Sequence, residues 1–198
     1  DNSLIGNSLG NSLDGGDGND SLIGGAGNDT YFVDNTSDQV FEEANGGTAD
    51  TIFSSVGNTL SANVENLVYT GEANASLSGN ALNNILDGSG AGRNTLIGGV
   101  GNDTYVVNAA RIGTVVENSL AGSGVDTIRF VGASAAINNP AFANIEALDF
   151  SQLTSQAAVT LAGSSPGLQR VTGSAGRDTI RVTTNTVSYT HLTLPTIL

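Results

Sequence analysis

A nine-residue repeat with glycine and aspartate at fixed positions dominates this sequence. Glycine stands at positions one, two and four of the repeat, aspartate at six and a large apolar residue at eight. Three segments follow this pattern closely: 15–23, 24–32 and 98–106. Three weaker copies occupy 33–41, 89–97 and 173–181. A unit this short cannot bury a core alone, so the repeat predicts a solenoid in which each unit stacks on its neighbours.

A longer duplication overlies the nonamers. Residues 6–15 match 79–88 at an offset of 73, and residues 24–31 match 98–105 at an offset of 74. The chain therefore divides into repeat blocks and β-rich connectors. The predicted repeat blocks are 1–42, 79–118 and the start of a third at 163–186, and the predicted connectors are 43–78 and 119–162.

Each nonamer divides naturally into a turn of six residues and a strand of three. Glycine permits the positive φ values of tight turns, and the strand triplets carry β-favouring residues that alternate about position eight. A flexible glycine-rich linker would not keep this phase. We therefore predict an all-β fold, a parallel β-roll or β-solenoid with two nonamers per coil. Ile23 and Phe32 should face outward, and the position-eight residues should form a ladder-like core: Leu13, Leu22, Tyr31, Val40, Leu96 and Tyr105.

Charge then predicts what the turns bind. In a coil of eighteen residues, Asp20 lies under Asp38 and Asn11 under Asp29, at the strand spacing of about 4.8 Å. Two carboxylates about 5 Å apart repel by roughly 0.8 kcal/mol in water and about 3 kcal/mol at an effective dielectric of 20. A hard divalent cation would reverse this repulsion. Aspartate and glycine carbonyl oxygens suit calcium, which accepts irregular geometry, better than magnesium, and zinc or copper would lack His and Cys ligands.

The nonamers resemble the repeats-in-toxin (RTX) family, the hemolysin-type calcium-binding repeats of secreted bacterial proteins, whose signature is G-G-x-G-x-D-x-U-x. The resemblance implies a parallel β-roll with calcium between successive turns, an extracellular location and export by the type I secretion machinery. It assigns carboxylate ligands to Asp20, Asp29 and Asp103, with Asp38 and Asp178 in phase but with weaker glycine support. It assigns carbonyl ligands to the turn glycines: Gly15, Gly16, Gly18, Gly24, Gly25, Gly27, Gly98, Gly99 and Gly101.

The second block has lost acidic residues, since Asn108 stands where the first block has Asp34 and Ile112 lies near the position of Asp38. We expect several calcium ions mostly within 15–38 and one partial site around Asp103. The connectors should continue as short strands without metal. Four isolated carboxylates are expected in solvated turns: Asp50, Glu65, Asp126 and Glu146.

Composition excludes several other functions. The net charge is -13 and all six basic residues are arginine, which argues against nucleic-acid binding. Cysteine is absent, so disulfides and thiolate sites are excluded, and no apolar run is long enough for a transmembrane segment. The chain has no H-E-x-x-H motif and no lysine, so we do not expect an enzyme here, although composition leaves catalysis by carboxylate pairs open.

The leading hypothesis is therefore a calcium-binding module of a large secreted protein, folded and stabilised by extracellular calcium. Two alternatives stay open: an accessory repeat region of a secreted protease or polysaccharide-active enzyme, and a stiff spacer of a surface adhesin. The absent initiator methionine and leader suggest a fragment. Residues 187–198, which include His191, the only histidine, have no repeat phase and resemble a translated sequencing adapter, so we exclude them as an artefact.

Overall fold

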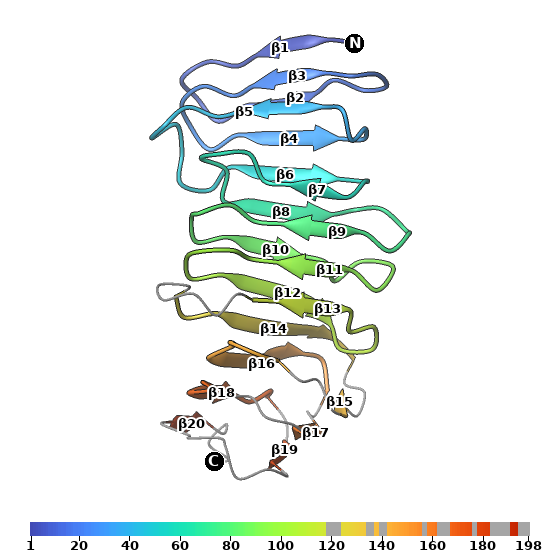
Figure 1. Ribbon diagram of the computed structural model, residues 1–198, viewed down its shortest axis with the longest axis vertical. Helices are drawn as coiled ribbons and strands as arrows, with labels where there is room; N and C mark the ends of the chain where they lie inside the picture. The colour runs from blue at the N-terminus through green and yellow to red at the C-terminus, as the bar shows by residue number, and fades with distance from the viewer. Residues whose placement is uncertain are drawn as a thin grey trace.

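The structure is a computed structural model in which β-strands wind into a parallel β-solenoid along one long axis (Figure 1). It describes residues 1–117, 124–133, 137–138, 142–155, 158–161, 167–175, 178–182 and 191–193. Every pairing between its strands is parallel, and no helix occurs in these ranges, so none there could span a membrane. The predicted all-β solenoid is confirmed.

Successive strands alternate between two faces of the solenoid. One face, the continuous face, is a ten-stranded sheet of β2 (Ser12–Asp14), β4 (Thr30–Val33), β6 (Thr51–Ser54), β8 (Asn66–Tyr69), β10 (Ile85–Asp87), β12 (Thr104–Asn108), β14 (Thr127–Gly132), β16 (Ala147–Leu153), β18 (Arg170–Thr172) and β20 (His191–Thr193). The other, the interrupted face, has three sheets. They consist of β1 (Ser3–Ile5), β3 (Ser21–Ile23) and β5 (Gln39–Phe41); of β7 (Asn58–Thr59), β9 (Ser76–Ser78), β11 (Thr95–Ile97) and β13 (Thr114–Val116); and of β15 (Ile137–Asn138), β17 (Ala158–Leu161) and β19 (Thr179–Val182).

The core is a ladder of inward-facing side chains between the two faces. Leu13 pairs with Tyr31 on the continuous face, and Leu22 pairs with Val40 on the interrupted face. All six predicted position-eight residues are buried, which confirms the inward phase. Phe32 points outward as predicted, and its ring stacks on that of Phe53 with centroids 5.6 Å apart. Ladders of this kind stabilise a sheet through contacts between side chains in register.

The first coils advance 18 residues, as two nonamers require, and the connector changes this spacing. From β4 to β6 the chain advances 21 residues, since Tyr31 pairs with Ile52, and from β6 to β8 only 15, since Ile52 pairs with Leu67. The short coil leaves only two residues for β7, and β7 pairs with β9 but not with β5. The interruption of this face therefore coincides with the shortest coil of the connector.

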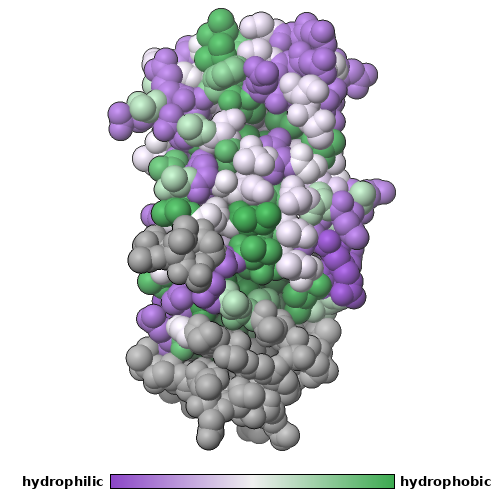
Figure 2. Space-filling view, in the orientation of Figure 1, coloured by the Kyte–Doolittle hydropathy of each residue, from purple (hydrophilic) through white to green (hydrophobic). Residues whose placement is uncertain are grey.

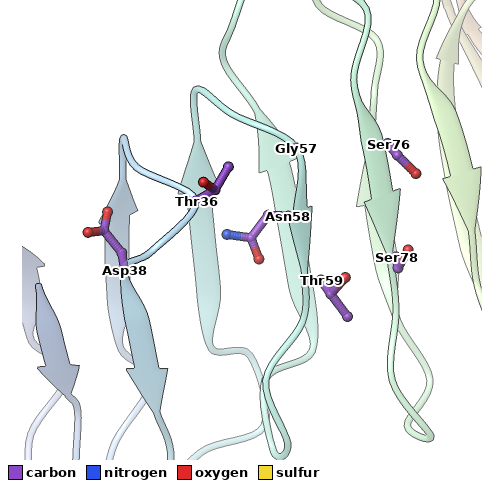
Figure 3. Close-up of a pocket in the computed structure, with 7 residues that line it drawn as sticks. All are labelled: Thr36, Asp38, Gly57, Asn58, Thr59, Ser76 and Ser78. Carbon is purple, nitrogen blue, oxygen red and sulfur yellow. The ribbon is translucent and has the colours of Figure 1, made fainter. Parts of the chain in front are cut away.

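A polar groove of about 490 Å³ lies at this interruption. Figure 3 shows the residues that line it: Thr36 and Asp38 between β4 and the start of β5, Asn58 and Thr59 of β7, and Ser76 and Ser78 of β9 beyond. In the space-filling view, apolar side chains form a band along the long axis and hydrophilic ones gather toward its sides (Figure 2).

The described strands run from the first repeat block into the first connector without a break in the continuous face. The boundaries of blocks and connectors therefore stay predictions. Of the segment proposed as an artefact, all but His191–Thr193 lies outside the described residues.

Candidate metal centre

Each strand of the continuous face from β2 to β16 directly follows an acidic or amide residue, and we call this series the turn ladder. Its members are Asn11, Asp29, Asp50, Glu65, Asn84, Asp103, Asp126 and Glu146. Each acidic member accepts a hydrogen bond from the backbone N–H group of the ladder residue one coil earlier. The N–H of Asn11 donates to Asp29 Oδ1 at 2.6 Å, and the N–H of Asp29 donates to Asp50 Oδ1 at 2.6 Å. One oxygen of each of these aspartates is therefore engaged in holding two coils together.

The same two aspartates form an acidic cluster with Glu42, which we call the first cluster. One carboxylate oxygen of each residue lies within 4.8 Å of the other two. Asp29 is 1% and Asp50 0% exposed, and Oδ2 of both lacks a hydrogen-bond partner. The hydroxyl of Tyr31, a core residue of β4, donates to Glu42 Oε2. Two buried oxygens are thus available to a ligand.

A second cluster of the same build consists of Asp103, Glu117 and Asp126, again with oxygens within 4.8 Å of one another. All three residues are buried, and Oδ2 of Asp103 and Oδ2 of Asp126 lack a hydrogen-bond partner. The hydroxyl of Tyr105 donates to Glu117 Oε2. The N–H of Asp103 donates to Asp126 Oδ1 at 2.8 Å, as the N–H of Asp29 does to Asp50. The sequence duplication therefore extends to the arrangement of the acidic side chains.

Glycine leaves the space that both clusters need. A Cβ atom at Gly24 would overlap the Tyr31 hydroxyl and Asp29 Oδ2, and a Cβ at Gly98 would overlap the same groups of the second cluster. Position one of these nonamers therefore requires glycine for close approach as well as for backbone freedom. At Gly47 a Cβ would meet the carbonyl oxygen of Gly27 and both oxygens of Asp50, so backbone carbonyls also lie near the first cluster.

The electrostatics of the clusters favour a bound cation. Three carboxylates at 4.8 Å repel by about 3.5 kcal/mol per pair at an effective dielectric of 20. Burial, together with the charge of Glu117, raises the pKa of Asp103 to about 6 and that of Asp126 to about 7. Burial also raises the pKa of Glu42 and of Asp50. Buried, unpartnered carboxylate oxygens beside carbonyls form the donor set that calcium prefers.

The aspartates predicted as ligands from the sequence lie in different environments. Asp29 and Asp103 each enter an acidic cluster. Asp20 is buried at a turn of the interrupted face, where it accepts the N–H of Asn2 at 2.5 Å and its own N–H donates to Asp38 Oδ1 at 3.0 Å. The predicted stacking of Asp20 under Asp38 is thereby confirmed. Neither residue belongs to the two clusters.

Asp178 is half-buried and accepts hydrogen bonds from the N–H and the hydroxyl of Ser174, at 2.8 and 2.6 Å. These bonds lie within a single turn, so this carboxylate also does not join either cluster. The nine predicted turn glycines all lie in described turns or at their edges, and their role as carbonyl ligands stays a prediction: Gly15, Gly16, Gly18, Gly24, Gly25, Gly27, Gly98, Gly99 and Gly101.

The expectation that four connector carboxylates are solvated is wrong for Asp50 and Asp126, which are fully buried. Glu65 and Glu146 are half-buried, and each accepts the N–H of the aspartate one coil earlier at 2.9 Å. The reason is that the connectors keep the coil geometry although they lose the glycines. The phrase D-T-I at both Asp50 and Asp126 resembles D-T-Y at positions six to eight of the nonamer, and would have identified both residues.

Asn63 positions Glu42 through an unusual backbone conformation. Its φ is 65°, in the left-handed region, and its side-chain amide donates to the carbonyl oxygen of Glu42 at 3.0 Å. Asn144 repeats this arrangement, with φ 58° and a bond to the carbonyl oxygen of Glu117 at 3.1 Å. Asparagine tolerates this left-handed region better than most residues.

Replacing Asn63 by alanine is therefore expected to lower the free energy of unfolding by about 1–2 kcal/mol, since both the hydrogen bond and the tolerated φ are lost. Asn63→Gly keeps the φ and should cost less, and urea denaturation measures both variants. Equal stability of Asn63→Ala and the unmodified protein would contradict this role.

Comparison with known proteins agrees with the turn geometry. The family model described as the RTX calcium-binding nonapeptide repeat matches residues 5–40 and 69–105, in four copies. Searches of the curated proteins and of the solved structures gave no match. The matched ranges contain Asp29 and Asp103, whereas the other four carboxylates of the clusters lie beyond them: Glu42, Asp50, Glu117 and Asp126.

Proposed function

Because the chain carries RTX calcium-binding nonapeptide repeats, we propose that it is a calcium-dependent folding module of a secreted bacterial protein. The observation that carries the proposal is the buried position-six aspartate with an unpartnered Oδ2, present at Asp29 and again at Asp103. A buried carboxylate without a partner is costly unless a cation or a proton compensates it. The repeats are a calcium-binding scaffold, and their family is not a catalytic one.

Calcium would supply the positive charge that this part of the chain lacks. Asp29 and Asp103 would contribute carboxylate oxygens at the turns of the continuous face, and Asp20 and Asp38 at the turns of the interrupted face. The turn glycines would expose carbonyl oxygens toward the same spaces. Because each aspartate also accepts an N–H from the neighbouring coil, occupancy of the turns would stabilise the stacking of coils, and binding free energy would contribute to folding.

The proposed extracellular location follows from the calcium concentrations at which such sites bind. Extracellular calcium modules have dissociation constants on the order of 10⁻⁴–10⁻³ M, so they stay empty at low calcium and fill outside the cell. We propose that the chain is exported with its repeats unfolded, by the type I secretion machinery associated with this family, and folds where calcium is abundant. The net charge of -13 supports this order of events, because self-repulsion opposes folding before the cation binds.

Circular dichroism tests the proposal. In calcium-free buffer the full chain should be only marginally stable and show a reduced β signal, and this signal should rise on addition of calcium at millimolar concentration. Magnesium at the same concentration should produce little change, because it demands near-ideal octahedral geometry. A spectrum that is the same in chelator and in calcium would refute the proposed function.

A further inference from the structure

We propose that the two acidic clusters are calcium sites of a second kind, each binding one ion and holding the end of a nonapeptide block to the connector that follows. Each site would combine one nonapeptide aspartate with two carboxylates from the segment that follows it. These are Glu42 and Asp50 beside Asp29, and Glu117 and Asp126 beside Asp103. The inference rests on the proposed function, and it extends calcium binding to residues outside the matched repeat ranges.

The unpartnered oxygens provide the first argument. In each cluster both aspartates use Oδ1 to accept a backbone N–H and leave Oδ2 buried without a hydrogen bond. The unpartnered atoms are the complete set of such buried side-chain atoms in the described residues: Asp29 Oδ2, Asp50 Oδ2, Asp103 Oδ2 and Asp126 Oδ2. All four atoms belong to the two clusters, so among the described residues buried side-chain oxygens without a hydrogen bond occur only there.

The tyrosine at each cluster provides the second argument. Tyr31 and Tyr105 are fully buried, and each donates its hydroxyl hydrogen to the glutamate of its cluster. This bond fixes one oxygen of each glutamate beside the aspartates and leaves the hydroxyl lone pairs as acceptors. The tyrosines are therefore positioning residues that hold Glu42 and Glu117 beside the aspartates.

The repetition of the cluster provides the third argument. The nonapeptide aspartates Asp29 and Asp103 are 74 residues apart in the sequence, whereas Asp50 and Asp126 are 76 apart, so the intervening segments differ in length. The same contacts nevertheless form in both places. Two differently spaced segments that bring the same three carboxylates and a tyrosine hydroxyl together indicate a shared ligand.

The donor set identifies the class of ligand. Each cluster offers three carboxylates and one phenol, and no nitrogen or sulfur ligand. Hard cations such as calcium or a trivalent lanthanide prefer such oxygen ligands, whereas zinc and copper prefer imidazole and thiolate. The competing occupant is a proton shared among the three carboxylates, and the experiments below separate the two.

Terbium luminescence provides the first test, because the chain has four tyrosines and no tryptophan. Excitation of tyrosine should sensitise emission from terbium bound to the full chain, since Tyr31 and Tyr105 lie at the two sites. The double variant Tyr31→Phe and Tyr105→Phe should lose more than half of this emission. Tyr69→Phe is the matched control, because the Tyr69 hydroxyl donates to the carbonyl oxygen of Ala73 outside both clusters.

Calcium stoichiometry provides the second test. Glu42→Gln with Glu117→Gln keeps an acceptor for each tyrosine hydroxyl and removes one charge per cluster, so equilibrium dialysis should show two fewer ions bound per chain at a calcium concentration that just saturates the unmodified protein. Glu43→Gln with Glu72→Gln removes the same charge from exposed positions and should keep the full count.

These outcomes separate the two proposals. Unchanged stoichiometry in Glu42→Gln with Glu117→Gln, in a protein that still folds with calcium, would overturn this inference and leave the proposed function intact. Proton sharing predicts that same result. An unmodified chain that binds no calcium would overturn both.

Discussion

Replacing Asp29 and Asp103 by asparagine is expected to stabilise the protein in chelator and to destabilise it in calcium. Asparagine keeps the oxygen that accepts the N–H of the preceding coil and removes a buried negative charge. Without calcium, the double variant loses repulsion within both clusters, so its melting temperature should rise. With calcium, it loses a charged ligand at both sites. A site at one hundred times its dissociation constant contributes about 2.7 kcal/mol, so two lost sites would cost about 5 kcal/mol, or roughly 10–20 °C.

The matched control is the double variant Asp14→Asn and Asp87→Asn. These residues end β2 and β10, point outward, and each accepts only a local N–H in the following turn. The change in net charge is identical, but neither residue belongs to a cluster. Thermal unfolding of both double variants, with and without calcium, measures the effect. A shift of the same sign in chelator and in calcium would contradict a metal role for Asp29 and Asp103.

In calcium-free buffer the stability of the protein is expected to fall as the pH rises from 5 to 8. Burial raises the pKa of Asp103 to about 6 and of Asp126 to about 7, above the ordinary value of 3.8. Between these values the folded state holds protons that the unfolded state has lost. The free energy of unfolding therefore decreases with pH, and the contribution is complete below about pH 4 and lost as the pH passes the folded pKa values.

Calcium should reverse this dependence. An ion bound by carboxylates competes with protons, so in millimolar calcium the melting temperature should rise over the same pH range. We expect a fall of roughly 5 °C or more between pH 5 and pH 8 without calcium. Asp103→Asn with Asp126→Asn should flatten both curves. A melting temperature in calcium-free buffer that increases from pH 5 to pH 8 would contradict the assignment.

Much of the fold could be predicted because its period is local. Glycine at fixed positions sets the turns, and position eight sets the inward side, so Leu22 and Tyr31 were assigned to the core from the sequence and are fully buried. The 18-residue coil likewise followed from the nonamer and is confirmed where Leu22 pairs with Val40. Nothing in the nonamer predicts the 15-residue coil that ends at β8, because the connector carries no glycine signature to mark its turns.

The candidate site was predicted only in part, and for the same reason. Asp29 and Asp103 carry the repeat signature. Asp50 lies beside Asp29 only because the coil between them has 21 residues, and the sequence does not predict that length. Metal-free connectors and a weaker second block are predicted when only acidic residues at the nonamer positions are considered. In the structure, Glu117 and Asp126 give the second block the same number of clustered carboxylates as the first.

The sequence by itself determined the solenoid, its inward phase and the calcium-binding character of its turns, because each depends on residues within one or two nonamers. Only the tertiary structure decided which carboxylates meet. Residues 21 and 23 positions apart, such as Asp29 with Asp50 and Asp103 with Asp126, become neighbours because parallel coils stack in register, and that register follows from the length of every intervening turn.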